Sequence, residues 1–324
     1  MMRGVIQNGF GDPSEVLRIG EVAAPAVADD GVLVGVRAAS IHIGDVYGVR
    51  GLPKVMRPLF KSMIADSGVI GQDMAGIVES VGKDVTRLAV GDEVFGTCKG
   101  AFAEYAVTSA DALAPKPTGL TFEQASAIGV SAFTALQALR SHGKLREGQH
   151  VLVTGASGGV GTFAVQIAKA MGAEVTGVCS TRNLDLVRSI GADHVIDYTE
   201  EDFTRGQTAY ELILDNVGSH PLGEMRGVLT PGGLLLANGA PAPTGWFGGL
   251  GHPLKVAVAS LFSAKQGRPF LSRENEEDLA KLRELAEAGS VEPVVDRVFP
   301  FEAAVDALAF VGEGHNRGTS VIAM

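Results

Sequence analysis

Between residues 119 and 271, short apolar runs of strand length alternate with stretches that carry apolar side chains at helical spacing. The runs are rich in β-branched and aliphatic residues and predict buried parallel strands at 151–154, 175–179, 194–197, 211–215 and 234–237. Helices are predicted between the first two strands, from Phe163, Ile167, Ala170 and Met171, and over 121–139, with Thr121 as N-cap. This alternation is typical of an α/β fold, a doubly wound parallel sheet.

Residues 1–118 follow a different pattern, with short strands separated by glycine-containing turns. Strands are predicted at 32–38, 75–81, 93–95 and 103–107. Many short strands between turns favour a compact antiparallel barrel or sandwich. After residue 272 we expect a charged amphipathic helix, a strand, a short helix and a last strand, at 273–288, 294–299, 301–311 and 320–323.

The two patterns predict two domains. With 324 residues, 46% of them apolar, the chain is long enough to build two hydrophobic cores. We expect a β-rich domain, residues 1–118 and 272–324, and a nucleotide-binding domain inserted in it, residues 119–271. A cleft between two such domains is the usual place for a small-molecule site.

A glycine loop joins the first predicted parallel strand to the helix that follows. It reads Gly155-Ala-Ser-Gly-Gly-Val-Gly161. Glycine lets the backbone approach a pyrophosphate, whose charge is met by free N–H groups and the positive end of the helix dipole. The loop therefore predicts dinucleotide contacts at Gly155, Ser157, Gly158, Gly159, Val160 and Gly161. The spacing G-x-x-G-x-x-G departs from the common fingerprint, so the alternative is an ordinary glycine-rich turn.

The end of the second predicted strand indicates which dinucleotide binds. An NAD site usually places Asp or Glu there to accept from the ribose hydroxyls. This chain has Cys179, Ser180, Thr181 and Arg182 instead. Hydroxyls followed by a guanidinium suit a 2′-phosphate, so Ser180 and Arg182 predict NADP(H). The alternative is that Arg182 is a solvated residue at a helix start.

Charge and cysteine content exclude several other functions. The net charge of −10 argues against nucleic acid and anionic membrane as main partners. Two cysteines far apart in the sequence, Cys98 and Cys179, indicate a reducing compartment without a disulfide framework. The first residues lack the apolar core of a signal peptide, and no apolar run approaches the length of a membrane span. We expect a soluble, cytoplasmic protein.

The chain resembles the medium-chain dehydrogenase/reductase superfamily, most closely its zinc-independent, quinone-oxidoreductase-like (zeta-crystallin-like) branch. The resemblance covers essentially the whole chain. It is most specific in the glycine loop, in GADHVIDY (191–198) and in the block from Gly71 to Gly96. It implies a GroES-like catalytic domain, a Rossmann domain, NADPH as cofactor, a quinone or α,β-unsaturated carbonyl substrate, and homodimerisation through the edge of the nucleotide-domain sheet.

The zinc ligands of that superfamily are missing here. Zinc-dependent relatives use a Cys in the segment matching 40–45, a His-Glu pair after the glycine matching Gly71, and a Cys near the start of the long helix. The corresponding residues of this chain are His42, Gln72-Asp73 and Ala127. A catalytic zinc needs three protein ligands from Cys, His and carboxylate, so we predict no metal site.

Without a metal, a side chain must donate a hydrogen bond to the carbonyl oxygen that gains charge. The resemblance places residues 42–47 against the nicotinamide, and either Tyr47 or His42 could donate and then supply a proton. Tyr47 matches a tyrosine of quinone reductases, whereas His42 replaces an Asn found in many of them. The alternatives are a packing role for Tyr47 and an indirect one for His42.

The resemblance also implies further cofactor contacts at Ser131, Tyr198, Asn216 and Asn238. From the sequence alone, the last three are polar residues at the carboxyl ends of predicted parallel strands, where ligands bind in such sheets. Residues 52–70 read as a loop or helical lid, and 241–253, with Trp246 and Phe247, as a second border of the substrate site. An ordinary packed helix is the alternative for the first of these.

Three functions fit these observations. The first is NADPH-dependent reduction of quinones or activated double bonds by metal-free hydride transfer. The second is an alcohol or aldehyde oxidoreductase of the same fold, which the missing zinc ligands disfavour. The third is an NADPH-binding structural or sensor protein without turnover, because a glycine loop reports binding rather than chemistry.

Overall fold

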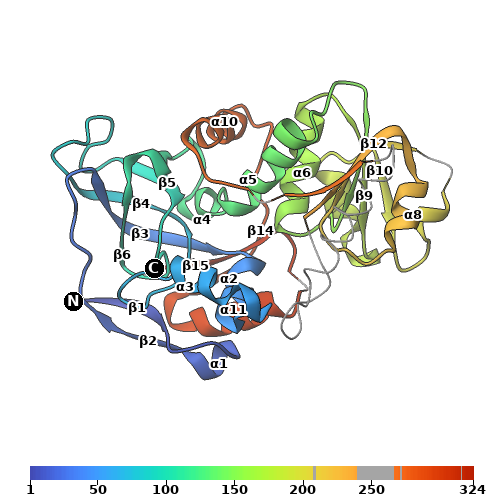
Figure 1. Ribbon diagram of the computed structural model, residues 1–324. Coiled ribbons are helices and arrows are strands. Elements are labelled where there is room, and N and C mark those ends of the chain that lie inside the picture. Colours follow the sequence, from blue (N-terminus) through green and yellow to red (C-terminus); the bar gives the residue numbers. More distant parts are fainter. Residues whose placement is uncertain (207–208, 239–265, 271, 315) are drawn as a thin grey trace. The chain divides into compact units, whose positions relative to one another are not determined.

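The computed structural model describes residues 1–206, 209–238, 266–270, 272–314 and 316–324 (Figure 1). The chain divides into two compact units. Unit 1 comprises Met1–Phe133 and Glu274–Met324, and unit 2 comprises Thr134–Arg273. Unit 1 extends to residue 133, whereas the boundary predicted from the sequence lies at 118.

Unit 2 is built on a parallel sheet. Its described strands lie in the order β10-β9-β8-β11-β12-β13, and every neighbouring pair is parallel. Their bounds are β8 (His150–Thr154), β9 (Glu174–Cys179), β10 (His194–Asp197), β11 (Tyr210–Asp215), β12 (Leu229–Ala237) and β13 (Gln266–Pro269). The five predicted strands are confirmed, and β13 is an additional one. This is the Rossmann fold expected from the alternating pattern.

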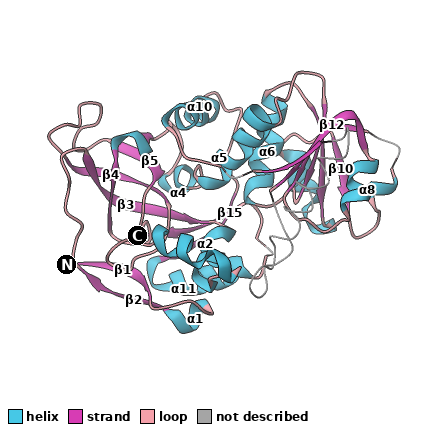
Figure 2. Ribbon diagram, in the orientation of Figure 1, coloured by secondary structure: helices cyan, strands magenta, loops and turns pink. Residues whose placement is uncertain are grey.

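The helices of unit 2 connect these strands (Figure 2). They include α6 (Gly159–Ala170), α7 (Leu184–Ser189), α8 (Leu222–Gly227) and the short turns η3 (Ala138–His142), η4 (Thr181–Asn183) and η5 (Phe203–Arg205). The α6 helix buries its side from Phe163 to Ala168. Gly172 follows it with φ +79°, a left-handed conformation that ends a helix without strain in glycine.

Unit 1 is a β-rich domain with most of its strands antiparallel. A seven-stranded sheet has the order β14-β15-β3-β4-β5-β7, with β6 paired to β3, and a separate two-stranded sheet joins β1 and β2. The bounds are β1 (Met2–Gln7), β2 (Leu17–Val22), β3 (Gly31–Ile41), β4 (Asp73–Val81), β5 (Glu93–Thr97), β6 (Tyr105–Ser109), β7 (Leu113–Pro115), β14 (Val295–Pro300) and β15 (Thr319–Ala323). The antiparallel arrangement expected for residues 1–118 is confirmed, because every described strand pair within them is antiparallel. In the C-terminal segment, β14 and β15 pair in parallel.

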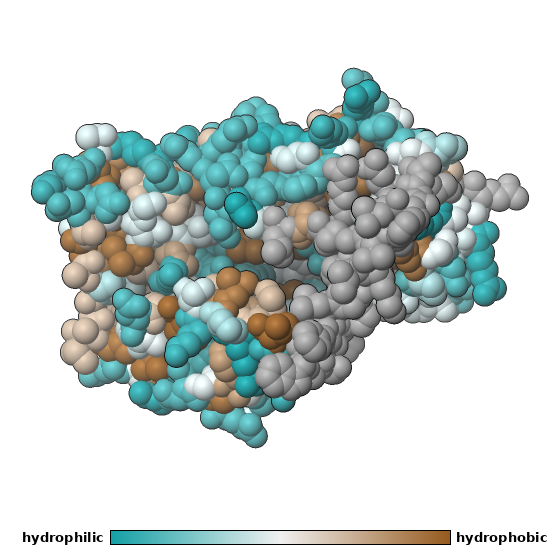
Figure 3. Space-filling view, viewed as in Figure 1, coloured by the Kyte–Doolittle hydropathy of each residue, from teal (hydrophilic) through white to brown (hydrophobic). Residues whose placement is uncertain are grey.

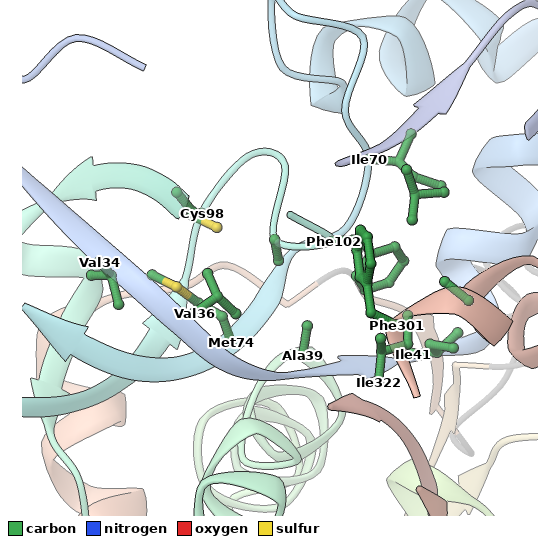
Figure 4. Packing of buried hydrophobic residues seen from close by; sticks show 14 of the residues in the cluster. Val34, Val36, Ala39, Ile41, Ile70, Met74, Cys98, Phe102, Phe301 and Ile322 are labelled. Carbon is green, nitrogen blue, oxygen red and sulfur yellow. The ribbon is translucent and has the colours of Figure 1, made fainter. Parts of the chain in front are cut away.

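The helices of unit 1 are short. They are α1 (Pro13–Val16), α2 (Ile43–Arg50), η1 (Lys54–Met56), α3 (Arg57–Met63), η2 (Ala110–Ala112), α4 (Phe122–Ser126), α10 (Glu276–Glu287), η6 (Phe301–Ala303) and α11 (Ala304–Gly312); α5 (Val130–Gln137) begins in unit 1 and ends in unit 2. The core of the unit joins residues far apart in the sequence, among them Ile41, Met74, Phe102, Phe301 and Ile322 (Figure 4). The C-terminal segment therefore contributes to the core of unit 1.

The helix predicted over 121–139 is interrupted, which corrects that prediction. It starts as expected, because Thr121 accepts from the N–H of Gln124 at 3.2 Å and the Gln124 side chain accepts from the N–H of Thr121 at 3.0 Å. The chain then leaves the helix after residue 126 and re-enters one at Val130. Gly129 lies against the Asp73 carboxyl group, where an added Cβ would overlap it. A side chain on another strand, not local propensity, sets this break.

No helix among the described residues is long and apolar enough to cross a membrane. Hydrophobic side chains do reach the surface of unit 1 around α2 and α3, where Ile43, Val55 and Leu59 are each more than 40% exposed. The brown areas over this part of the molecule in Figure 3 belong to a surface that is otherwise largely polar.

Candidate cofactor and substrate sites

The glycine loop of unit 2 forms an open cradle at the start of α6. Gly155 has φ +61°, and an added Cβ at Gly161 would overlap the carbonyl oxygen of Gly155, so both positions need glycine. At Gly158, the N-cap of α6, an added Cβ would meet only that same oxygen, at 3.4 Å. No side chain caps the helix. The N–H groups of its first turn, at Gly159, Val160 and Gly161, can therefore receive a phosphate, and the cradle fits a dinucleotide.

Asn183 links the loop to the end of β9, and sequence reasoning missed it. Its amide donates to the hydroxyl of Ser157 at 2.9 Å and to that of Ser180 at 3.2 Å. The side chain is 5% exposed, and its Oδ1 atom has no hydrogen-bond partner among the described residues. A buried acceptor without a partner beside a glycine cradle suits a donor group of a bound ligand, such as a ribose hydroxyl.

The end of β9 is polar and carries one exposed cation. Arg182 lies in η4 and is exposed, as is Thr181. None of the four residues directly after β9 carries a carboxylate, but Asp197, the last residue of β10, lies in register with Cys179 of β9. Its carboxylate accepts from the Thr199 N–H at 2.9 Å and hydroxyl at 2.7 Å. Hydrogen bonds from Thr181 and Thr199 lower the pKa of Asp197, so it is an anion beside this site.

Tyr198 follows directly after Asp197 and is 60% exposed. A phenol ring held this openly at the carboxyl end of a parallel strand can cover an adenine.

The carboxyl ends of β8, β11 and β12 are joined by hydrogen bonds. The Thr154 hydroxyl donates to Asp215 at 2.8 Å and accepts from the Asn216 N–H at 2.9 Å. The Asn238 amide donates to the Asn216 side-chain oxygen at 2.8 Å. Asn216 and Asn238, which are 22 residues apart, thus lie together at the sheet edge where ligands bind in this fold. Thr154 and Asp215 are further members of this group that the sequence reading did not name.

A second group of polar side chains lies in unit 1, at the start of α2. Asp45 Oδ2 accepts from the backbone N–H of His42 at 3.0 Å and lies 3.5 Å from His42 Nε2. The Gln72 amide nitrogen lies 3.2 Å from the same His42 nitrogen. Burial raises the pKa of Asp45, although the neighbouring His42 and hydrogen bonds from His42 and Gln72 oppose that effect.

Asp73 extends this group into the core. Its carboxylate lies 3.3 Å from the Ser40 hydroxyl and accepts from the N–H of Val130. Burial raises the pKa of Asp73 to about 7, although the neighbouring His42 opposes this effect. Ser131, the next residue of α5, is only 6% exposed. Asp73 thus joins the polar group to Val130, the residue before Ser131.

A pocket opens beside these residues within unit 1. Its walls are largely apolar, and its polar side chains are Gln7, Asp45 and Gln72; it is also lined by Gly44, Gly48, Val49, Phe60, Met63, Ile64, Ile70 and Gly71. Phe60 and Met63 belong to α3 and Ile64 follows it, so the predicted lid segment 52–70 is partly helical and forms one wall. The second predicted border, 241–253 with Trp246 and Phe247, lies outside the described residues.

The two predicted donors lie differently with respect to this pocket. His42 touches two of its polar lining residues, Asp45 and Gln72. Tyr47 is half-buried on α2 and is not among the residues that line the pocket. Burial raises the pKa of Tyr47, so its hydroxyl stays protonated at neutral pH.

The positions that hold zinc in related enzymes do not form a ligand set. Ala127 offers no ligand atom, and Gln72 uses its amide on His42. Within the described ranges, no group of three His, Cys, Asp or Glu side chains is arranged to hold a metal ion. Cys98 is buried, and burial raises the pKa of its thiol further, which disfavours the thiolate that a metal needs.

Comparison with known proteins agrees with this architecture. Residues 28–118 match the alcohol dehydrogenase GroES-like domain, and residues 190–322 match a zinc-binding dehydrogenase family. A mouse protein named NAD(P)H oxidoreductase RTN4IP1, mitochondrial, is 34% identical over 90% of this chain and 81% of its own. The chain belongs to the medium-chain dehydrogenase/reductase superfamily.

Two further similarities place it among the quinone-oxidoreductase-like members. The 2-methylene-furan-3-one reductase of tomato is 32% identical over 95% of this chain and 76% of its own length. The quinone oxidoreductase of Coxiella burnetii has the same fold, with a TM-score of 0.86 and 28% identity over 100% of this chain and 99% of that one. The resemblance inferred from the sequence is confirmed, and the protein is an NAD(P)H-dependent oxidoreductase.

Proposed function

We propose that this protein is an NADPH-dependent reductase of quinones or α,β-unsaturated carbonyl compounds that transfers hydride without a metal. The observation that carries the proposal is the unit 1 pocket, with apolar walls and polar side chains at Asp45 and Gln72 beside His42. An apolar carbonyl compound matches such a pocket. Relatives named for a quinone and for a conjugated furanone support the same substrate class.

The proposal assigns the cofactor to unit 2. Gly155, Ser157 and residues 158–161 would hold the pyrophosphate, while Tyr198, Asn216 and Asn238 would line the adenosine and ribose. Arg182 with Ser180 would read the 2′-phosphate, and the anionic Asp197 next to them would disfavour phosphate unless a cation balances it. NADPH rather than NADH is therefore a proposal that depends on Arg182.

The proposal assigns the acceptor to unit 1, the catalytic domain. When bound, NADPH supplies hydride, and this chain must stabilise the negative charge that develops on the acceptor oxygen. Tyr47 and His42 are the donors expected from the sequence. Ser131 would position the nicotinamide from the first turn of α5.

The test is a panel of acceptors incubated with the protein and NADPH while absorbance of the reduced nicotinamide is followed. We expect oxidation with quinones and enones, and the same rate after dialysis against a chelator. Activity on simple aldehydes or alcohols that a chelator abolishes would instead support a zinc-type oxidoreductase. Tight NADPH binding without oxidation by any acceptor would support a structural or sensing role.

Homodimerisation and a cytoplasmic location stay predictions. In the described part of unit 2, β13 is the outermost strand and pairs with β12. Light scattering of the purified chain measures the assembly directly, and a mass of one chain would contradict the dimer.

A further inference from the structure

The proposed reaction consumes a proton as well as a hydride, and the structure offers a proton donor that the sequence did not suggest. We propose that Asp45 delivers this proton to the acceptor oxygen and that His42 resupplies it. The inference rests on the proposed reductase function. It assigns Asp45 as the catalytic acid, and it makes His42 a positioning and relay residue rather than the direct donor.

Position is the first argument. Asp45 lines the unit 1 pocket, whereas neither His42 nor Tyr47 does. The Asp45 side chain is 4% exposed and that of His42 is 10% exposed, so both are largely shielded from bulk water. Of the two, Asp45 is the one that forms part of the pocket wall, so a molecule bound there would meet its carboxyl group.

The contacts between the side chains form the second argument. Asp45 Oδ2 is fixed by the His42 N–H at 3.0 Å and lies 3.5 Å from His42 Nε2. That nitrogen also lies 3.2 Å from the Gln72 amide. The amide NH₂ group can only donate, so it makes His42 Nε2 an acceptor in the arrangement described. Proton transfer to Asp45 therefore requires the Gln72 amide to turn its oxygen toward Nε2, which leaves a protonated ring 3.5 Å from the carboxyl group.

Charge is the third argument. Asp73, the first residue of β4, interacts electrostatically with His42, with Asp45 and with Glu274. Asp45 and Asp73 are both buried, and burial raises the pKa of each carboxyl. Burial therefore favours the protonated form of both carboxyl groups more than it would for exposed ones. Asp45 is the member of the cluster that meets the pocket.

The step balances as follows. The acceptor carbon receives the hydride, and the electron pair of the carbonyl or enone moves to its oxygen. The new O–H bond forms as the O–H bond of Asp45 breaks, which leaves a carboxylate. That carboxylate takes a proton from protonated His42, and His42 takes one from solvent. The sum is acceptor plus NADPH plus H⁺ giving reduced acceptor plus NADP⁺.

The test compares Asp45→Asn, His42→Gln and the parent enzyme over pH 5–9 with one quinone and one enone. Asn keeps the acceptor for the His42 N–H but carries no acidic proton. We expect Asp45→Asn to lower kcat by roughly 100-fold or more, the usual range for a lost general acid, with NADPH affinity unchanged. In the pH profile of the parent enzyme, activity should fall at high pH as the acid ionises. This alkaline limb should vanish in Asp45→Asn and return in Asp45→Glu. His42→Gln should lower kcat and shift the limb.

Asp92→Asn is the matched control, since Asp92 also accepts a backbone N–H, from Ala89 at 2.8 Å, but on an exposed turn. Retention of parent kcat and of the alkaline limb by Asp45→Asn would overturn the inference, as would loss of that limb in Tyr47→Phe instead. If Asp45→Asn does not fold, the His42→Gln variant is the test. An alkaline limb unchanged from that of the parent enzyme would also overturn the inference. If none of the quinones and enones is reduced by the parent enzyme and NADPH, the proposed function itself is refuted, and the inference with it.

Discussion

Asp73 accepts the backbone N–H of Val130 with both of its carboxylate oxygens, each at 3.1 Å. This contact joins the first residue of β4 to the first residue of α5, and the two are 57 positions apart. It satisfies a donor that the helix start would otherwise leave without a partner. It also fixes the turn that carries Ser131, which is why Gly129, with no side chain to displace the carboxyl group, precedes it.

Replacing Asp73 by Asn should change how stability depends on pH. Burial raises the pKa of Asp73 from 3.8 to about 7, so between these values the folded chain binds a proton that the unfolded chain has lost. The contribution of Asp73 to the free energy of unfolding therefore falls as pH rises through this window and levels off above it. Asn, which stays neutral, should remove this slope.

Urea unfolding of both forms at pH 4.5, 6 and 8 measures the effect as a difference. We expect the parent to lose stability relative to Asp73→Asn with rising pH. Asp92→Asn controls for the loss of one negative charge. A difference independent of pH would mean that Asp73 is ionised throughout.

Strands and helix starts could be predicted from the sequence wherever the residues within the element determine them. The strands at 151–154 and 175–179 are apolar because both faces of a parallel sheet are covered, and Thr121 with Gln124 is a local capping signal. The break in the helix before Val130 could not be predicted, because its cause is Asp73, which lies on β4. The parallel pairing of β14 with β15 is likewise set by tertiary contacts rather than by either strand's pattern.

The candidate site divides in the same way. The glycines of the loop could be predicted, because the backbone conformation and close contacts that require them lie within the loop itself. Asn183 gave no signal, since its partner Ser157 is 26 residues away and an Asn in the first turn of a helix is common. Asp45 was hidden because it reads as an ordinary capping residue of α2, and only the pocket distinguishes it.

Gly158→Ala should weaken dinucleotide binding without unfolding unit 2. Its φ of −85° is open to any residue, and an added Cβ would meet only the Gly155 oxygen, at 3.4 Å. The methyl group would instead occupy the cradle where the proposal places the pyrophosphate. We expect an unchanged melting temperature and an NADPH Kd raised at least about tenfold, which corresponds to ~1.4 kcal/mol.

Calorimetry on the variant and on Gly223→Ala checks this. Gly223 lies in α8 with no atom within 4 Å of an added Cβ, so that control should bind NADPH normally. Normal binding by Gly158→Ala would remove the loop from the cofactor site.

Asn183→Ala should lower both stability and cofactor affinity. It removes two side-chain hydrogen bonds in a buried place and leaves the Ser157 hydroxyl without its donor, at a cost of about 1–3 kcal/mol. Denaturant unfolding with and without NADPH measures both effects. Ser189→Ala, which removes a hydroxyl bonded to Leu186 on the exposed side of α7, is the control and should change little. Equal stability of Asn183→Ala and parent would mean that water replaces the amide freely.

Arg182→Ala tests the cofactor preference. A charged hydrogen bond to the 2′-phosphate is worth about 1.5–3 kcal/mol, so the Kd for NADPH should rise by roughly one to two decades. NADH has no phosphate at that position, and its Kd should stay within about twofold; since Asp197 stays ionised nearby, NADPH should even become the weaker ligand. Fluorescence titration of both cofactors gives the two constants from one preparation. Arg188→Ala removes a guanidinium from the same helical segment, where it pairs with Asp185 at 3.2 Å, and should affect neither cofactor. Equal losses for NADPH and NADH would show that Arg182 supports the fold of the site rather than reading the phosphate.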